Sequence, residues 1–151
     1  MVTYIEQGNI FSLQDIPNYA HGCNCAGAMG KGIALQFKEK FPQMYIEYKN
    51  LCKKGLFPLG DIYVYNYGNG TIFNLGTQTT WKTNANLNAV ESSLIKMLSY
   101  AHQNNICKIA LPKIGAGLGG LNWDDIKFII DKVAENYPNI DLFVVENYKE
   151  V

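Results

Sequence analysis

Two glycine-rich segments, each lying between an apolar run and a helical pattern, constrain the fold of this 151-residue chain more than any other feature. The first glycine segment covers residues 21–32 and follows a short apolar stretch. The second glycine segment covers residues 113–120 and has four glycines within residues 115–120. Glycine at such a junction lets the backbone approach a neighbour closely. Because each segment leads into a helix N-terminus, the pair predicts a pocket where backbone N–H groups hold a phosphorylated ligand.

Hydrophobic periodicity predicts alternating strands and helices in a single domain, residues 1–151. The predicted strands cover residues 2–5, 19–23, 62–65, 71–75, 107–111 and 140–145. The predicted helices cover residues 33–41, 42–55, 86–103 and 122–136. This order favours a three-layer α/β/α fold, in which a central mixed, mostly parallel sheet of about six strands has helices on both faces. In such sheets ligands bind at the carboxyl ends of the strands, where both glycine segments fall.

The charge composition excludes some classes of partner. Thirteen basic residues, all of them lysine, balance thirteen acidic residues. A neutral chain has no electrostatic basis for strong binding of free nucleic acid or an anionic membrane, and neither is expected as a partner. Without arginine, an anion must be held by backbone donors, helix dipoles or lysine.

The four cysteines, Cys23, Cys25, Cys52 and Cys107, do not have the spacing of a zinc site. We therefore expect no metal and no cofactor. Free thiols, together with the lack of a signal peptide or a membrane-spanning apolar run, favour a cytoplasmic protein. We expect that it is a monomer.

Residues 27–33 match neither common phosphate-binding motif. No Gly-Lys-Ser/Thr ends the segment, as a Walker sequence requires, and the glycine spacing differs from the dinucleotide fingerprint. A tight turn is the structural alternative for either glycine segment taken alone. Their placement at equivalent strand ends favours phosphate binding.

The two glycine segments in full resemble a known family. Residues 21–34 read His-Gly-Cys-Asn-Cys-Ala-Gly-Ala-Met-Gly-Lys-Gly-Ile-Ala, and residues 112–123 read Pro-Lys-Ile-Gly-Ala-Gly-Leu-Gly-Gly-Leu-Asn-Trp. Both resemble the macrodomain family of ADP-ribose-binding modules, and Gly8-Asn9-Ile10 fits the same family. Over essentially the whole chain, the resemblance is closest to the ADP-ribose-1″-phosphate phosphatases and the terminal ADP-ribose glycohydrolases.

The resemblance implies a ligand and a set of contacts. The ligand would be ADP-ribose, its 1″-phosphate or an ADP-ribosylated macromolecule. Gly8, Asn9 and Ile10 would lie near the adenine, and Tyr148 could stack on it. The other implied contacts are Asn24, Gly27, Ala28, Met29, Gly30, Lys31, Gly32, Ile33, Gln78, Lys113, Ile114, Gly115, Ala116, Gly117, Leu118, Gly119 and Gly120.

Two departures from the family pattern affect the mechanism. The glycohydrolase branch uses a lysine that attacks the distal ribose, and Gln78 stands near that position. It also uses an aspartate as acid/base, where this chain has Gly119. Glutamine cannot form the covalent adduct, and glycine has no proton to exchange. Lys82 would replace the lysine only if its loop folds back onto the site.

A water-based reaction is the remaining catalytic hypothesis. In it, Asn24 and His21 orient the water, and the dipoles of the glycine segments stabilise the transition state. Each residue has a structural alternative, since His21 could bond to backbone and Asn24 could form a turn. The sequence therefore leaves two functions open. One is hydrolysis of an ADP-ribose derivative at the distal ribose, and the other is binding of ADP-ribose without turnover.

Overall fold

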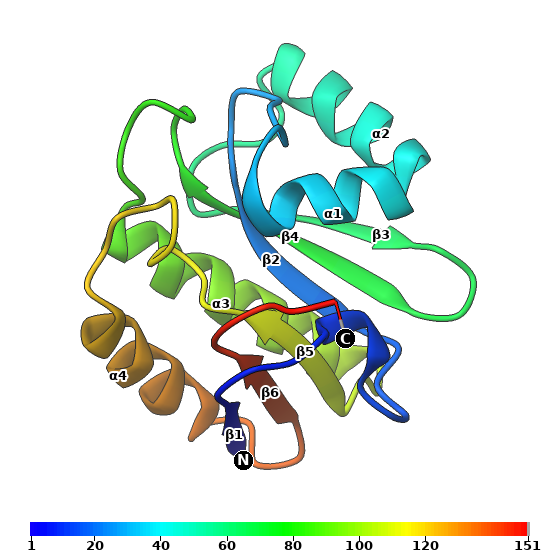
Figure 1. Ribbon diagram of the computed structural model, residues 1–151, viewed down its shortest axis with the longest axis vertical. Helices are drawn as coiled ribbons and strands as arrows, with labels where there is room; N and C mark the ends of the chain where they lie inside the picture. The colour runs from blue at the N-terminus through cyan, green and yellow to red at the C-terminus, as the bar shows by residue number, and fades with distance from the viewer. Residues whose placement is uncertain (151) are drawn as a thin grey trace.

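A six-stranded sheet crosses the computed structural model, which describes residues 1–150 (Figure 1). The strand order across the sheet is β1-β6-β5-β2-β4-β3. All neighbouring pairs are parallel except β3 and β4, which form an antiparallel hairpin. The strands are β1 (Val2–Ile5), β2 (Tyr19–Asn24), β3 (Ile62–Asn66), β4 (Thr71–Gln78), β5 (Lys108–Pro112) and β6 (Asp141–Val145).

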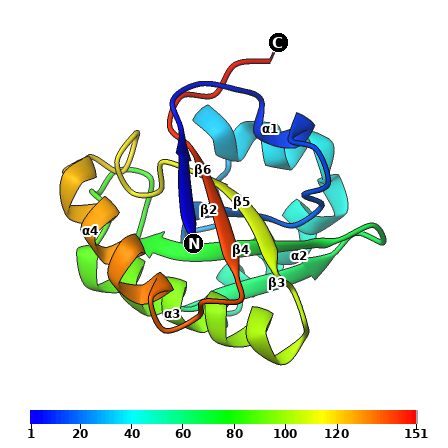
Figure 2. The ribbon, with the colours of Figure 1, turned by 90° about the horizontal axis from the view of Figure 1, so that it is seen from below.

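Helices cover both faces of the sheet (Figure 2). On one face, α1 (Gly32–Lys40) and α2 (Pro42–Lys53) pack over a core that includes Phe37 and Tyr48. On the other, α3 (Leu87–Gln103) and α4 (Trp123–Ala134) enclose a second core. A short 3₁₀ helix, η1 (Ile10–Ser12), lies between β1 and β2. The predicted order of strands and helices and the three-layer fold are confirmed.

Local sequence explains where the helices begin. Pro42 occupies the first position of α2, where its missing N–H is tolerated. The Asn86 side chain accepts a hydrogen bond from the Ala89 N–H and caps α3, and the Asn122 side chain caps α4 in the same way. Within residues 1–150, no helix has the length and apolar character needed to cross a membrane.

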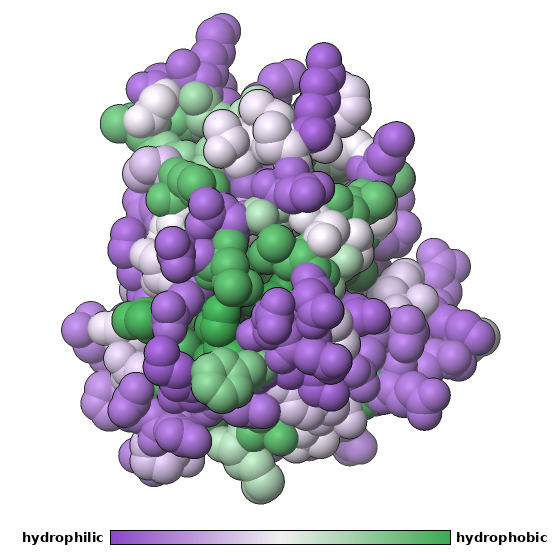
Figure 3. Space-filling model, turned by 90° about the vertical axis from the view of Figure 1, so that its left-hand side faces the viewer, coloured by the Kyte–Doolittle hydropathy of each residue, from purple (hydrophilic) through white to green (hydrophobic). Residues whose placement is uncertain are grey.

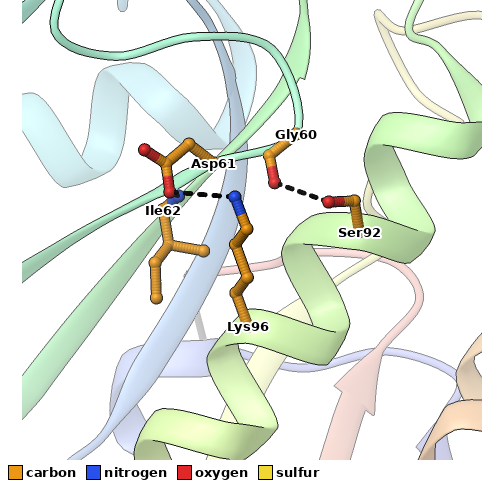
Figure 4. Close-up of polar contacts among 5 residues, drawn as sticks. All are labelled: Gly60, Asp61, Ile62, Ser92 and Lys96. Carbon is orange, nitrogen blue, oxygen red and sulfur yellow. Dashed lines mark hydrogen bonds and ion pairs between the residues drawn. The ribbon is translucent and has the colours of Figure 1, made fainter.

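The end of β4 is held at a fixed place by the turn before β3 (Figure 4). The Lys96 ammonium on α3 lies 3.3 Å from a carboxylate oxygen of Asp61, and the Ser92 hydroxyl donates to the Gly60 carbonyl at 3.1 Å. The Gly60 N–H in turn donates to the carbonyl of Gly76 in β4. This chain of contacts fixes the strand end that leads into Gln78.

Candidate functional site

A cleft of about 1010 Å³ opens at the carboxyl ends of β2, β4, β5 and β6. Its four walls are the segments that follow these strands. The segments after β4 and β5 lie on one side of the molecule (Figure 1). On that side, hydrophobic side chains gather in the middle of the surface and hydrophilic residues surround them (Figure 3). The lining residues are Gly22, Cys23, Asn24, Ala28, Met29, Gly30, Lys31, Gly32, Ile33, Ala34, Thr77, Gln78, Trp81, Lys82, Pro112, Lys113, Ile114, Gly115, Gly117, Leu118, Val145, Glu146, Asn147 and Tyr148.

The first wall is a loop organised by the Asn24 side chain. Its Oδ1 accepts from the N–H groups of Ala26 (3.0 Å) and Ala28 (3.2 Å), and its Nδ2 donates to the Ala28 carbonyl (2.8 Å). The buried Tyr48 hydroxyl donates to the Asn24 carbonyl at 2.6 Å and lies 3.0 Å from Oδ1. Asn24 is thus chiefly a loop-forming residue. Among the described residues, Nδ2 has one acceptor, so its second hydrogen is not used by the protein.

The start of α1 offers backbone donors to the same cleft. Lys31, the N-cap residue of α1, makes no side-chain capping bond. The first N–H groups of a helix have no partner within the helix, and they carry its positive dipole end. Gly32, Ile33 and Ala34 all line the cleft. This wall therefore suits an anion such as a diphosphate.

The second glycine segment is built by close backbone packing. A Cβ atom placed on Gly119 would lie 2.6 Å from the Gly115 carbonyl oxygen and 2.9 Å from its Cα. Gly115 itself has a φ of 73°. The Gly119 carbonyl accepts from the Ala85 N–H at 2.8 Å, which joins this segment to the chain before α3. Position 119, where the resemblance implied an aspartate in the glycohydrolases, therefore has no room for a side chain in this backbone conformation.

The wall after β4 is fixed by Gln78. Its Nε2 donates to the carbonyls of Thr80 (2.9 Å) and Thr83 (2.8 Å), so the amide closes its own loop. Trp81 lies on this loop with 62 % of its surface exposed, and the Lys82 ammonium is 5.2 Å from the centre of the Trp81 ring. Lys82 lines the cleft, but its ammonium group lies over an indole.

His21 lies outside the cleft. It is fully buried, and its ring stacks on Phe37 with centroids 4.1 Å apart. Its Nε2 is 2.6 Å from Oδ1 of Asn74, whose Nδ2 donates to the Tyr63 carbonyl. Asn74 Oδ1 is therefore the acceptor and Nε2 carries the proton. Burial lowers the pKa of His21 to about 4, despite the opposing effect of the Asn74 hydrogen bond. The geometry contradicts the predicted acid/base role. His21 is a structural residue, although its partner is the Asn74 side chain and not the backbone.

Gly8, Asn9 and Ile10, the predicted adenine contacts, pack against the segment after β6 and do not line the cleft. The Gly8 N–H donates to the Asn147 carbonyl, and the Lys149 N–H donates to the Gly8 carbonyl. Asn9 uses Oδ1 to cap η1, and Ile10 is buried. These residues support residues 145–148, which do line the cleft. Gly8, Asn9 and Ile10 are not among the lining residues, and their contact with the adenine stays a prediction.

The other predicted contacts divide according to their place in the loops. Gly27, Ala116, Gly119 and Gly120 are absent from the lining. They lie within the same segments, but at positions that shape the backbone instead of facing the cleft. The predicted contacts that do line the cleft are Asn24, Ala28, Met29, Gly30, Lys31, Gly32, Ile33, Gln78, Lys113, Ile114, Gly115, Gly117 and Leu118. Their contact with a ligand stays a prediction.

Glu146 is a residue of the cleft that was not identified from the sequence. In the structure the Trp123 indole N–H donates to Glu146 at 2.7 Å, and Glu146 lines the cleft. Glu146 directly follows the last strand, at the sheet edge where both glycine segments had already been placed. That position was the available signal.

The cysteines near the site are not activated. Burial raises the pKa of the Cys25 thiol to about 11 and that of Cys23 well above its ordinary value. At neutral pH both are thiols rather than nucleophilic thiolates. Across residues 1–150, no group of three His, Cys, Asp or Glu side chains is placed to hold a metal ion.

A mostly parallel α/β sheet with a glycine-walled cleft at its carboxyl edge is an arrangement typical of nucleotide-binding α/β proteins. Comparison with known proteins narrows the class: residues 20–130 match the Macro domain family model, and the chain belongs to that family. The chain is 34 % identical to the DNA ADP-ribosyl glycohydrolase of Mycobacterium tuberculosis over 80 % of its own length. It is 27 % identical to the ADP-ribose 1″-phosphate phosphatase of Meyerozyma guilliermondii over 87 % of its length and 93 % of that protein.

Solved structures agree with the family assignment. The macrodomain of Mycobacterium tuberculosis DarG superimposes with a TM-score of 0.90 at 31 % identity, covering 97 % of both chains. The present chain spans only about a third of the length of the first curated relatives it matches, covering 36 % of the mycobacterial glycohydrolase. The similarity is therefore to the macrodomain part of those proteins.

Proposed function

We propose that this protein binds ADP-ribose in the cleft and hydrolyses an ADP-ribose derivative at the distal ribose, either the 1″-phosphate or an ADP-ribosyl linkage to a macromolecule. The observation that carries the proposal is the convergence of two glycine segments and the uncapped start of α1 on one cleft. Lys31, Lys82 and Lys113 line the same cleft. Together they provide anion binding without arginine.

The relatives support the choice of ligand. Their names describe a DNA ADP-ribosyl glycohydrolase, an ADP-ribose glycohydrolase and an ADP-ribose 1″-phosphate phosphatase. All three act on an ADP-ribose derivative. ADP-ribosylated DNA is accordingly one of the macromolecular substrates to be tested, beside ADP-ribosylated protein and the 1″-phosphate.

Hydrolysis in this chain would use water instead of a covalent lysine adduct. The Gln78 amide is engaged with its own loop, and Gly119 offers no acid/base group. The free Nδ2 hydrogen of Asn24 and the exposed N–H groups of the glycine segments would orient water and stabilise negative charge. His21 has no part in this mechanism, because it is buried behind the cleft.

Binding without turnover is the second candidate function. Gln78 and Gly119 favour it, because neither can supply the missing catalytic groups. Among the described residues that line the cleft, Glu146 is the only acidic one. In this case the protein would recognise free or macromolecule-linked ADP-ribose and release it unchanged.

One sequence of measurements tests both functions. Calorimetry with ADP-ribose addresses the shared claim, and no binding at millimolar ligand would refute it. Incubation with ADP-ribose-1″-phosphate and with ADP-ribosylated DNA or protein then separates an enzyme from a binding module by product release. If product forms, Asn24→Ala should slow the reaction, whereas His21→Gln should leave the rate unchanged.

The assembly and location are also proposals. A cytoplasmic location is supported by the four cysteines, which are free thiols among the described residues. The monomeric state is proposed as the simplest assembly. Light scattering on the purified chain measures the mass directly, and a dimer mass would contradict the proposal.

A further inference from the structure

We propose that Glu146 accepts a hydrogen bond from a ribose hydroxyl in the adenosine half of the ligand, and so makes the cleft selective for ribonucleotides over deoxyribonucleotides. The inference rests on the proposed binding of ADP-ribose. It assigns a specificity-determining role to a residue outside both glycine segments.

Glu146 is unusual among the residues that line the cleft. It is the only acidic residue in the described lining, which also holds three lysines. Its side chain is 22 % exposed, and it directly follows β6. A carboxylate in a cleft suited to a diphosphate weakens diphosphate binding by repulsion, unless it faces a part of the ligand that donates hydrogen bonds.

The carboxylate is held by one of its two oxygens. The Trp123 indole N–H donates to Oε2 at 2.7 Å, and the Lys127 ammonium lies 3.8 Å from the same oxygen. Trp123 is itself fixed by an edge contact with the Tyr4 ring, with centroids 6.3 Å apart. No group of residues 1–150 donates a hydrogen bond to Oε1. A fixed carboxylate with one unoccupied oxygen is a preorganised acceptor.

The lining also offers groups for the two ends of a nucleoside diphosphate. Tyr148 offers an aromatic ring two residues beyond Glu146. On the other side, Lys113 begins the second glycine segment, and its ammonium lies 5.8 Å from the centre of the Trp123 ring. A nucleoside diphosphate has its base, ribose and phosphates in the same order. With the base at Tyr148 and the phosphates at the glycine segments, the ribose diol lies next to Glu146.

The chemistry of the pair fits this placement. An ionised carboxylate only accepts hydrogen bonds, and ribose hydroxyls donate them. An acidic residue on a ribose hydroxyl is a general means of selecting among nucleotides. A hydrogen bond to a charged acceptor contributes roughly 1.5–3 kcal/mol, which corresponds to a change in affinity of about 10- to 100-fold.

Affinity measurements with matched ligands and variants test the proposal. Wild-type protein, Glu146→Gln and Glu146→Ala would each be titrated with ADP-ribose and with its 2′-deoxyadenosine and 3′-deoxyadenosine forms. We expect wild type to bind at least one deoxy form about 10-fold more weakly than ADP-ribose. Glu146→Ala should bind ADP-ribose and that deoxy form with equal affinity. Glu146→Gln keeps a neutral acceptor, so its selectivity should lie between those of wild type and Glu146→Ala. Trp123→Phe, which loses the indole N–H, should reduce the selectivity while the protein stays folded by circular dichroism.

The outcomes separate this inference from the proposed function. Failure of wild type to bind ADP-ribose overturns both. Binding with ribose selectivity that survives in Glu146→Ala overturns the role of Glu146 alone. The analogue of ADP-ribose with hypoxanthine in place of adenine is titrated as well. If Glu146→Ala loses discrimination between the two bases and keeps its ribose selectivity, Glu146 contacts the base, and the inference is overturned.

Discussion

The two glycine segments lead to the same cleft but are held in place by different means. The first depends on buried polar side chains, with Asn24 and Tyr48 fixing the loop through hydrogen bonds. The second depends on contact between backbone atoms, with Gly119 packed directly against Gly115. Loss of a single hydrogen bond should therefore damage the first segment. The second should be damaged by the addition of a single carbon atom.

The largest expected effect is a loss of folding stability at low pH, caused by the buried His21 in the first glycine segment. His21 has a pKa of about 4 when folded and about 6.5 when unfolded, so the unfolded chain binds the proton more readily between these values. Stability from the neutral imidazole is complete above about pH 6.5 and is lost as the pH falls toward about 4. The full loss is about 3 kcal/mol. Denaturant titrations of wild type and His21→Gln across this range measure it.

His21→Gln is the control for wild type, because glutamine does not titrate. The difference in unfolding free energy between the two proteins should change with pH only below about 6.5. If the unfolding free energies of the two proteins change equally with pH below about 6.5, the prediction is contradicted. Affinity for ADP-ribose should stay within about threefold of wild type, since His21 does not line the cleft.

The second glycine segment is tested by Gly119→Ala. The added methyl group would meet the Gly115 backbone at 2.6 Å, so the loop must shift. We expect a loss of about 1–3 kcal/mol in unfolding free energy together with weaker ADP-ribose binding. Thermal unfolding and calorimetry measure the two effects. Gly117→Ala is the matched control, because no atom lies within 4 Å of a Cβ there, and its stability should change by less than about 0.5 kcal/mol. Similar results for the two variants would show that the packing at Gly119 is not restrictive.

The hydrogen bonds of the first segment are tested by Tyr48→Phe. The change removes a buried hydroxyl that bonds to the Asn24 carbonyl at 2.6 Å, and it leaves the ring in place. We expect a loss of about 1–2 kcal/mol in stability and weaker ligand binding. Tyr63→Phe is the control, since the Tyr63 hydroxyl bonds to Glu47 at the surface. A Tyr48→Phe protein as stable as Tyr63→Phe would show that the loop does not depend on this hydroxyl.

The sequence predicted the fold better than it predicted the site. Apolar periodicity, Pro42 and the capping residues Asn86 and Asn122 act locally, so each strand and helix could be located without the rest of the molecule. The role of a side chain in the cleft depends on its partners. Asn24 lines the cleft, but its own loop and Tyr48, twenty-four residues further on, occupy most of its hydrogen-bonding groups, and the local sequence gives no sign of the Tyr48 contact.

His21 and Glu146 illustrate the same limit in opposite directions. His21 is the first residue of the first glycine segment, but it lies on strand β2, whose alternation turns its side chain into the core against Phe37. Glu146 is remote from both segments in sequence and reaches the cleft because β6 lies beside β5. For His21 the outcome depends on α1 covering that face of β2 with Phe37, and for Glu146 it depends on the strand order. Both arise from long-range packing that no local pattern encodes.

The smallest expected effect belongs to Gln78, which closes the loop after β4 and does not take part in either glycine segment. Gln78→Met keeps the length of the side chain and removes both hydrogen bonds to the carbonyls of Thr80 and Thr83. Because these bonds are partly exposed to water, the loss in stability should be about 1 kcal/mol or less. Trp81, on the same loop, provides the measurement: its fluorescence should respond to ADP-ribose in both proteins, with the response weaker in Gln78→Met. Trp81→Phe leaves Trp123 as the remaining tryptophan and so measures how much of the fluorescence response comes from Trp123. A Gln78→Met protein that loses binding as completely as Gly119→Ala would mean that the cleft depends on a third rigid segment as much as on the two glycine segments.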